Sequence, residues 1–142
     1  MFVRGALSLR RQDKACPEAI ELQKRYDLVP ICPEVLGGLP TPRVSSEIIE
    51  DAQGFRVLNS EGTDNTEAFI AGAARALETI KREGREVAIL KAKSPSCGSG
   101  LIYDGTFTGS LIPGDGVTTR LFRRHNIRVI DETNISQLNI EQ

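Results

Sequence analysis

The sequence predicts an α/β protein, a single compact domain in which a mainly parallel sheet is covered by helices, as in a Rossmann-like three-layer fold. Two observations lead to this prediction. Apolar segments of strand length alternate three times with segments of helical periodicity, which is typical of a parallel sheet covered by helices. The length of 142 residues suits one domain with a sizeable core. We therefore treat residues 1–142 as one domain.

The composition favours a cytoplasmic protein. Hydrophobic residues make up 39% of the chain, charged residues 26%, and the net charge is −1. A charge so near zero provides no field that attracts nucleic acid or an anionic membrane, so neither is expected as a partner. Neither a membrane-spanning run nor a secretory signal is present in the sequence. The three cysteines include no C-x-x-C pair, which favours reduced thiols or metal ligands over disulfides.

A helix and a strand are predicted before residue 33. Pro17 suits the first position of a helix, and the residues up to Tyr26 have helical spacing. Residues 28–32 form an apolar run of strand length. Because proline cannot donate to a β-ladder, we place Pro30 near the end of this strand or at an edge of the sheet. Cys32 then follows the strand, at the start of a loop rich in glycine and proline.

A hairpin and the longest helix are predicted next. Residues 47–59 contain two short strands around a Gln-Gly turn. A helix starts at Asp64, which has the spacing of a capping box with Glu67. Gly84 is suited to end it. The apolar stripe expected to face the core consists of Phe69, Ile70, Ala73, Ala74, Leu77 and Ile80.

The last part of the chain repeats the strand and helix pattern. Residues 87–90 form a continuous apolar run, and residues 102–109 alternate and turn like a small hairpin. Asp115 is placed to cap a last helix, and Asn126 ends it before a strand at 127–130. The inward side chains of that helix are Val117, Leu121 and Phe122.

The chain is organised around the loop Lys91–Gly100, KAKSPSCGSG, which directly follows the apolar run 87–90. Ligands of open α/β sheets bind at the carboxyl ends of the strands. Cys32 also follows an apolar strand, so Cys32 and Cys97 are expected at one sheet edge, where two thiols suggest a metal or cluster site. The alternative is a connecting loop with two unrelated, buried cysteines. The single histidine, His125, follows two arginines, and a basic run of this kind is typical of the C-terminal end of a helix.

Three motifs carry a resemblance to a known family. They are Ile-Cys-Pro-Glu followed by Leu-Gly-Gly-Leu-Pro-Thr-Pro-Arg at 31–43, Lys-Ala-Lys-Ser-Pro-Ser-Cys-Gly at 91–98, and Ile-Tyr-Asp-Gly-Thr-Phe-Thr-Gly at 102–109. Together they resemble the bacterial thiouracil desulfurase family, formerly a domain of unknown function. The resemblance extends from about the first helix to the last strand.

The resemblance implies a [4Fe-4S] cluster held by three cysteines. The fourth iron is open to the sulfur of a thiolated base such as 2-thiouracil, which is converted to the carbonyl form without net redox change. Cys32 and Cys97 match two cluster ligands, and Glu34 matches the acid of the family motif. The other assigned positions are Ser94 and Ser96 as catalytic serines, and Gly98 and Ser99 for substrate binding.

The sequence departs from the family pattern at its beginning. Family members begin with a strand that leads to Cys-Leu-Leu-Gly and then to Arg-Tyr-Asp-Gly, and neither motif occurs in this sequence. We therefore expect an N-terminally shortened member that lacks the first strand and the first Cys motif. Cys16 does not match the missing ligand. Two alternatives stay open: a cluster-free relative whose loop at 94–100 binds a small anion or nucleotide, and a thiol enzyme with Cys97 as nucleophile.

Overall fold

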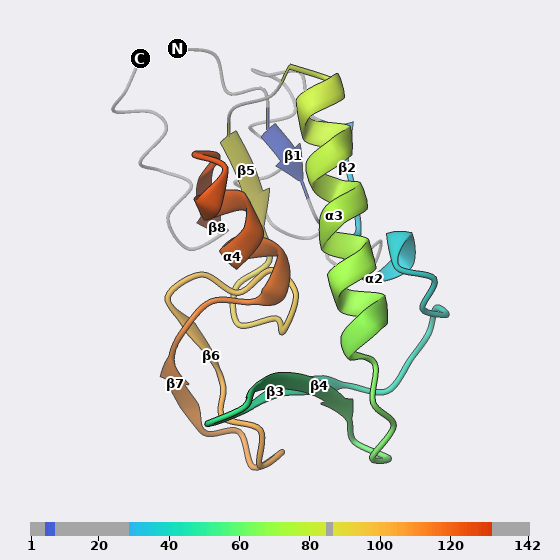
Figure 1. Cartoon of the computed structure of the whole chain (residues 1–142), viewed down its shortest axis with the longest axis vertical. Helices are drawn as coiled ribbons and strands as arrows, with labels where there is room; N and C mark the ends of the chain where they lie inside the picture. Colours follow the sequence, from blue (N-terminus) through green and yellow to red (C-terminus); the bar gives the residue numbers. More distant parts are fainter. Residues whose placement is uncertain (1–4, 8–28, 85–86, 132–142) are drawn as a thin grey trace.

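The structure, a computed structural model, describes residues 5–7, 29–84 and 87–131. Its main sheet has four parallel strands in the order β2-β1-β5-β8 (Figure 1). The strands span β1 (Gly5–Leu7), β2 (Val29–Pro30), β5 (Val87–Leu90) and β8 (Arg128–Asp131). The chain runs from β1 outward to β2 and then returns to the other side of β1, so the strand order reverses between β1 and β5.

Strand β5 is buried on both faces. Ala88 and Leu90 belong to a hydrophobic cluster with the helices, while Val87 and Ile89, which alternate with them, point to the opposite face. All four side chains are at most 1% exposed. A strand buried on both sides explains why its sequence is a continuous apolar run rather than an alternating one.

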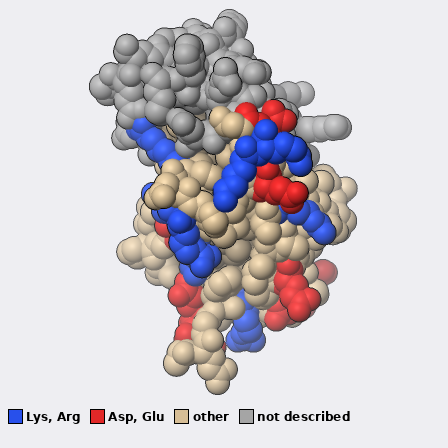
Figure 2. Space-filling model, turned by 45° about the horizontal axis from the view of Figure 1, so that its top comes forward, with Lys and Arg blue, Asp and Glu red and all other residues tan. Residues whose placement is uncertain are grey.

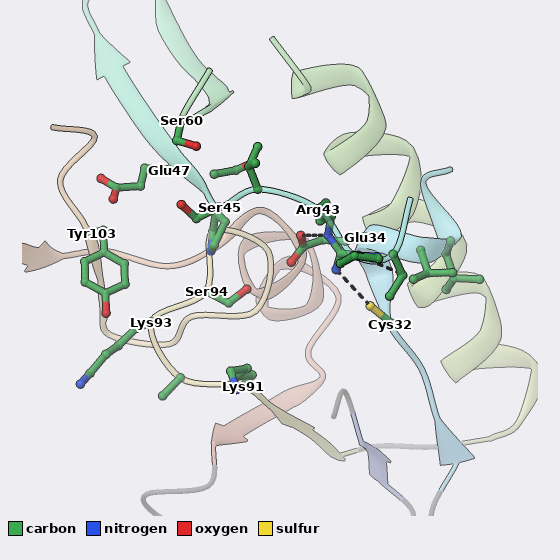
Figure 3. A pocket seen from close by; sticks show the side chains of 18 of the residues that line it. Cys32, Glu34, Arg43, Ser45, Glu47, Ser60, Lys91, Lys93, Ser94 and Tyr103 are labelled. Atoms are coloured by element: carbon green, nitrogen blue, oxygen red, sulfur yellow. Dashed lines mark hydrogen bonds and ion pairs between the residues drawn. The ribbon is translucent and has the colours of Figure 1, made fainter. Parts of the chain in front are cut away.

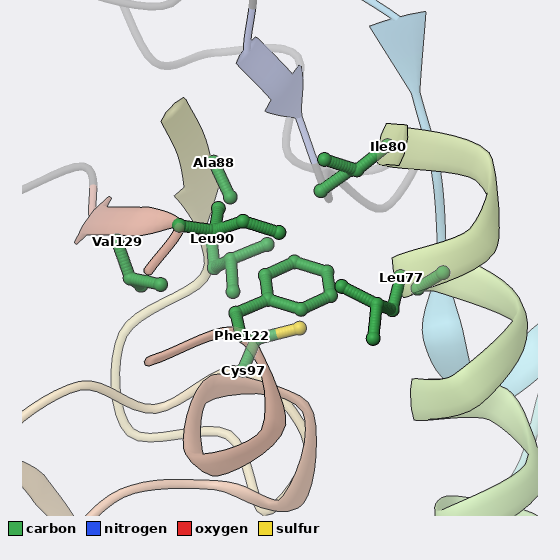
Figure 4. Packing of buried hydrophobic residues seen from close by; sticks show 9 residues of the cluster. Leu77, Ile80, Ala88, Leu90, Cys97, Phe122 and Val129 are labelled. Carbon is green, nitrogen blue, oxygen red and sulfur yellow. The ribbon is translucent and has the colours of Figure 1, made fainter. Parts of the chain in front are cut away.

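Two helices pack against each other and against the sheet, α3 (Thr66–Arg82) and α4 (Val117–Arg124). Figure 4 shows Phe122 of α4 between Leu90 of the sheet and Leu77 of α3. A short helix, α2 (Pro33–Leu36), packs on α3.

Two antiparallel hairpins lie beyond the carboxyl end of the main sheet (Figure 1). They are formed by β3 (Ser46–Asp51) with β4 (Gly54–Asn59), and by β6 (Leu101–Tyr103) with β7 (Leu111–Pro113). Helix α3 joins them to the sheet, because Phe69 and Ala73 in its first half pack against Ile48, Val57 and Ile102. The second half of α3 packs in a second cluster, which we call the sheet cluster. Its buried members are Ala76, Leu77, Ile80, Ala88, Leu90, Cys97, Phe122, Ile127 and Val129.

The α/β class is confirmed, and the strands between helices are parallel, with Pro30 both at a strand end and in an edge strand. The description of the sheet as mainly parallel is incomplete, since the hairpins add two antiparallel sheets. The expectation of a missing first strand also needs correction: Gly5–Leu7 forms β1, with hydrogen-bonded neighbours on both sides. The predicted first helix, 17–26, lies outside the described residues.

Most of the apolar stripe predicted for helix α3 faces the core, but the predicted burial of Ile70 and Ala74 is wrong. Ile70 is 49% exposed and Ala74 is exposed, whereas Ala76 is fully buried. At 100° per residue, positions 69, 73, 76, 77 and 80 share one side, and 70 and 74 turn away from it. The predicted capping box between Asp64 and Glu67 does not form. Asn65 is the N-cap, and Asp64 Oδ1 accepts bonds from the backbone N–H and the hydroxyl of Thr66.

Helix α4 begins after Gly116 rather than after a capping Asp115. The Asp115 carboxylate instead accepts a 2.8 Å hydrogen bond from the N–H of Gly100 and pairs with Arg123. The first N–H groups of the helix are bonded to carbonyls of the central loop: Val117 donates to Pro95, and Thr118 donates to Ser96. Helix α4 is therefore capped by the loop Lys91–Gly100 itself.

Within the described residues, none of the helices has the length and apolar character needed to cross a bilayer. On the face in Figure 2, positive and negative side chains are interspersed over the described part of the surface. This distribution agrees with a net charge of −1.

Candidate functional site: a pocket at the carboxyl edge of the sheet

A pocket opens where the two loops that follow β2 and β5 meet. Both strands are parallel to β1, which lies between them, so both loops leave the same edge of the sheet. This is the position at which the strand order reverses, and open α/β sheets bind ligands there. The polar side chains that line the pocket include Cys32, Glu34, Arg43, Glu47, Lys91 and Ser94.

Close packing of α2 on α3 places Cys32 and Glu34. A Cβ atom at Gly72 of α3 would lie 1.9 Å from the carbonyl oxygen of Pro33, and one at Gly37 would lie 2.0 Å from the carbonyl oxygen of Ala68. Only glycine permits this approach of two backbones. Because Cys32 is the N-cap of α2 and Glu34 lies in its first turn, the glycine contact sets the position of both side chains.

Arg43 joins the Glu34 carboxylate to the Cys32 sulfur. Its Nε atom donates to Glu34 Oε1 at 2.8 Å, and its Nη2 atom lies 3.8 Å from Cys32 Sγ. Figure 3 shows the three side chains pointing toward one another on one wall of the pocket. Burial lowers the pKa of the Arg43 guanidinium, but the bonds and charges of Glu34 and Cys32 outweigh it, so the pKa lies above its usual value. Arg43 is therefore a fixed positive charge.

Ser94 lines the pocket at the turn of the central loop. Its Oγ atom accepts hydrogen bonds from the N–H of Ser96 at 3.0 Å and from the N–H of Cys97 at 2.9 Å. A hydroxyl has two acceptor lone pairs and one proton to donate. With both lone pairs engaged, Ser94 is suited to donate a hydrogen bond rather than to accept one.

The other predicted residues of this loop are bonded to other parts of the chain. Ser96 is 1% exposed, and its hydroxyl is 2.8 Å from that of Thr118. The backbone of Gly98 bonds to Ser94 and Gly116, and the Ser99 hydroxyl accepts a bond from Arg123 on α4. None of the three lines the pocket. Their predicted catalytic and substrate-binding roles stay predictions.

Cys97 lies in the sheet cluster, not in the pocket lining. Its side chain is 2% exposed and packs with Phe122 and Leu77 (Figure 4). Ile31 and Leu36, on either side of Cys32, pack against the same cluster, so both cysteine loops converge on it. The close approach of the two sulfur atoms stays a prediction.

Sequence reasoning missed Arg43 and Glu47 as site residues. Glu47 is 8% exposed, and its Oε1 atom accepts hydrogen bonds from the N–H groups of Gly105 and Phe107, which holds that loop at the pocket. Arg43 is the last residue of the motif at 31–43, to which no role was assigned. The available signal was that residues 33–43, rich in glycine, proline and apolar side chains, contain one cation, Arg43, and one anion, Glu34, because a charge in such a loop needs a nearby partner.

The fold and the pocket define an α/β domain with a thiol, a carboxylate and a hydroxyl at the carboxyl edge of a parallel sheet. The family model described as 2-thiouracil desulfurase matches residues 9–134. The chain belongs to the 2-thiouracil desulfurase family, and the resemblance predicted from its motifs is confirmed.

One relative and one solved structure support this membership. The chain is 43% identical over 113 residues, 75% of each chain, to "Uncharacterized protein YbbK" of Bacillus subtilis (strain 168). A solved structure of "[4Fe-4S]-dependent thiouracil desulfidase TudS" has a TM-score of 0.81 and 33% sequence identity. That likeness covers 97% of this chain and 96% of the other. The enzyme class, a desulfurase that cleaves a C–S bond, follows from the family model and from the solved structure.

Proposed function

We propose that this protein removes sulfur from a thiolated nucleobase such as 2-thiouracil, with the reaction carried out in the pocket at the carboxyl edge of the sheet. Water supplies the oxygen of the new carbonyl, the C–S bond breaks, and hydrogen sulfide leaves, so oxidation states are unchanged. The observation that carries the proposal is the convergence of Cys32, Glu34 and Ser94, all three from family motifs, on one pocket.

Cys32 and Cys97 are the residues proposed to hold a [4Fe-4S] cluster. Thiolates suit iron, and the convergence of both cysteine loops on one hydrophobic cluster supports this assignment. When bound with one iron open, the cluster supplies a Lewis acid for the thiocarbonyl sulfur. Two thiolates hold a cluster poorly, and the described residues contain no group of three or more metal-ligating side chains. Cys16, outside the described residues, is the candidate for the third.

Glu34 and Ser94 are proposed to act on the substrate directly. The Glu34 carboxyl, held by Arg43 at one oxygen, lies in the pocket wall and is placed to move a proton to or from the attacking water and the leaving sulfur. Ser94 donates its hydroxyl proton as a hydrogen bond to the base or to the water. Its two backbone bonds keep the oxygen in place, so the donor is oriented before substrate binds.

The anion-binding alternative is disfavoured by the loop's own hydrogen bonds. It needs several backbone N–H groups of the loop at 94–100 to face a ligand. The N–H groups of Ser96 and Cys97 are bonded to the Ser94 hydroxyl, that of Gly98 to the Ser94 carbonyl, and that of Gly100 to Asp115. Capture of an anion would require breaking these bonds.

Anaerobic reconstitution with iron and sulfide tests the function. With Cys32 and Cys97 as the only thiolates, the chain should assemble the cluster poorly; with Cys16 as the third, we expect about four irons per chain, the visible absorption of a cluster, and stoichiometric release of sulfide and uracil from 2-thiouracil. Cys32→Ser and Cys97→Ser should each lose iron, and loss of iron in Cys16→Ser would identify the third ligand. A fully loaded chain that releases no sulfide contradicts the reaction. A chain that binds no iron favours the cluster-free alternative.

The three-layer arrangement is also kept as a proposal, supported by the burial of Val87 and Ile89 on the sheet face opposite α3 and α4. The cytoplasmic location and the single domain over residues 1–142 stay predictions.

A further inference from the structure

Arg43 makes polar contacts with the pocket loop beyond its ion pair with Glu34. Besides Glu34 and Cys32, its Nη1 atom donates to the carbonyl oxygen of Pro40 at 3.0 Å and to the hydroxyl of Thr41 at 3.2 Å. All of these partners lie within residues 32–43. The guanidinium is a planar fork whose donors have fixed relative directions, so four partners define its orientation.

The Arg43–Glu34 pair is largely removed from water. The two side chains are 16% and 12% exposed, and Nε and Oε1 are 2.8 Å apart. A charge-assisted bond in such surroundings is stronger and better oriented than an exposed ion pair. By comparison, the Arg120–Glu50 pair outside the pocket has a carboxylate that is 57% exposed.

The bond is made at one oxygen only. Among residues 5–7, 29–84 and 87–131, the Glu34 carboxylate is bonded through Oε1, and the side chain lines the pocket. Fixing Oε1 by a partner that is itself held by the Pro40 and Thr41 oxygens restricts rotation of the carboxyl group. The second oxygen, Oε2, then keeps one orientation relative to the pocket.

We propose that Arg43 is a positioning residue for the desulfuration: it holds the Glu34 carboxylate beside Cys32 so that one carboxyl oxygen is oriented for proton transfer to substrate. The inference rests on the proposed function of the pocket. Arg43 acts through Glu34 rather than on the substrate, so its loss should reduce catalysis and leave substrate binding nearly unchanged.

Turnover of 2-thiouracil by the reconstituted full chain tests the proposal. Arg43→Gln should lower kcat about 100-fold and change KM by less than about threefold, and Arg43→Lys, which keeps the charge, should recover part of the loss. The double variant with Glu34→Gln should be no slower than Glu34→Gln alone, because the arginine has no carboxylate left to orient. Arg120→Gln, the matched control from the Arg120–Glu50 pair, should retain wild-type turnover.

Losses that multiply in the double variant, or an Arg43→Gln variant with wild-type kcat, overturn the proposal. Iron content and the thermal midpoint of each variant separate misfolding from mispositioning. Crystal structures of the cluster-free wild type and Arg43→Gln test positioning without turnover: the Glu34 carboxylate should move by about 1 Å or more in the variant. An unmoved carboxylate overturns the proposal, whereas an iron-loaded wild type without turnover overturns the proposed function instead.

Discussion

Replacing Gly72 by alanine should displace the site although the residue lies on α3, outside the pocket. The added Cβ would lie 1.9 Å from the Pro33 carbonyl oxygen and 2.9 Å from its carbon. Contacts below 3.0 Å do not persist, so α2 must move by at least about 1.1 Å, since the clash is with backbone and no side-chain rotation relieves it. Cys32 and Glu34, at the start of α2, move with it.

Two opposing terms set the change in stability. Alanine is favoured over glycine inside a helix by about 1 kcal/mol. Overpacking costs about 1–3 kcal/mol, and a clash with backbone belongs at the upper end of that range. We therefore expect Gly72→Ala to lower the free energy of unfolding by about 1–2 kcal/mol. Because a displacement of about 1 Å at a reacting group can cost about 100-fold in rate, turnover should fall far more than stability.

Urea unfolding of the variant, followed by far-UV circular dichroism, measures the first effect, and sulfide release at saturating 2-thiouracil measures the second. Ala74→Gly at an exposed position of the same helix is the control for helix propensity, with an expected loss of about 1 kcal/mol. A Gly72→Ala variant that is about 1 kcal/mol more stable than wild type and keeps full turnover would show that α2 is not held by this contact.

Three further predictions concern the core, the pocket and the pH response. Leu77→Ala, in the sheet cluster, should lower the free energy of unfolding by about 2–5 kcal/mol in denaturant titrations, and a loss near zero would mean that this side of α3 is not packed. Ser94→Ala should reduce turnover more than Ser99→Ala, because the Ser99 hydroxyl is bonded to Arg123 away from the pocket; equal effects in steady-state kinetics would contradict the assignment of Ser94. Hydrogen bonds from the Thr106 side chain and backbone hold the pKa of Asp104 below its usual value, so its contribution to stability is present above the unfolded pKa and is lost as pH falls through the lowered folded pKa. The stability difference between wild type and Asp104→Asn should therefore shrink below about pH 4, and a difference that grows on acidification would contradict a lowered pKa of Asp104 in the folded state.

Many features of the fold and of the loops that form the pocket could be predicted from short stretches of sequence. The apolar run at 87–90, a proline at the end of an edge strand and a glycine ending α3 are each imposed by backbone sterics or by burial over a few residues. The cysteine motifs identified the family because long runs of specific residues seldom recur together by chance. These features depend on neighbours in the chain, and so the sequence by itself determined the class of fold, the family and the loops that form the pocket.

Only the tertiary structure decided how those loops are held. The Ser96 hydroxyl is hydrogen-bonded to that of Thr118, and the Glu47 carboxylate accepts a hydrogen bond from the N–H of Phe107. The backbone of Gly72 lies against that of Pro33. The partners in each contact are far apart in the sequence. Helical periodicity assigns a side of a helix only to within about one residue, and contact with the hairpins and the sheet selected Ala76 over Ile70. Such pairings depend on which surfaces meet when the chain closes, a property of the packed whole that no local pattern specifies.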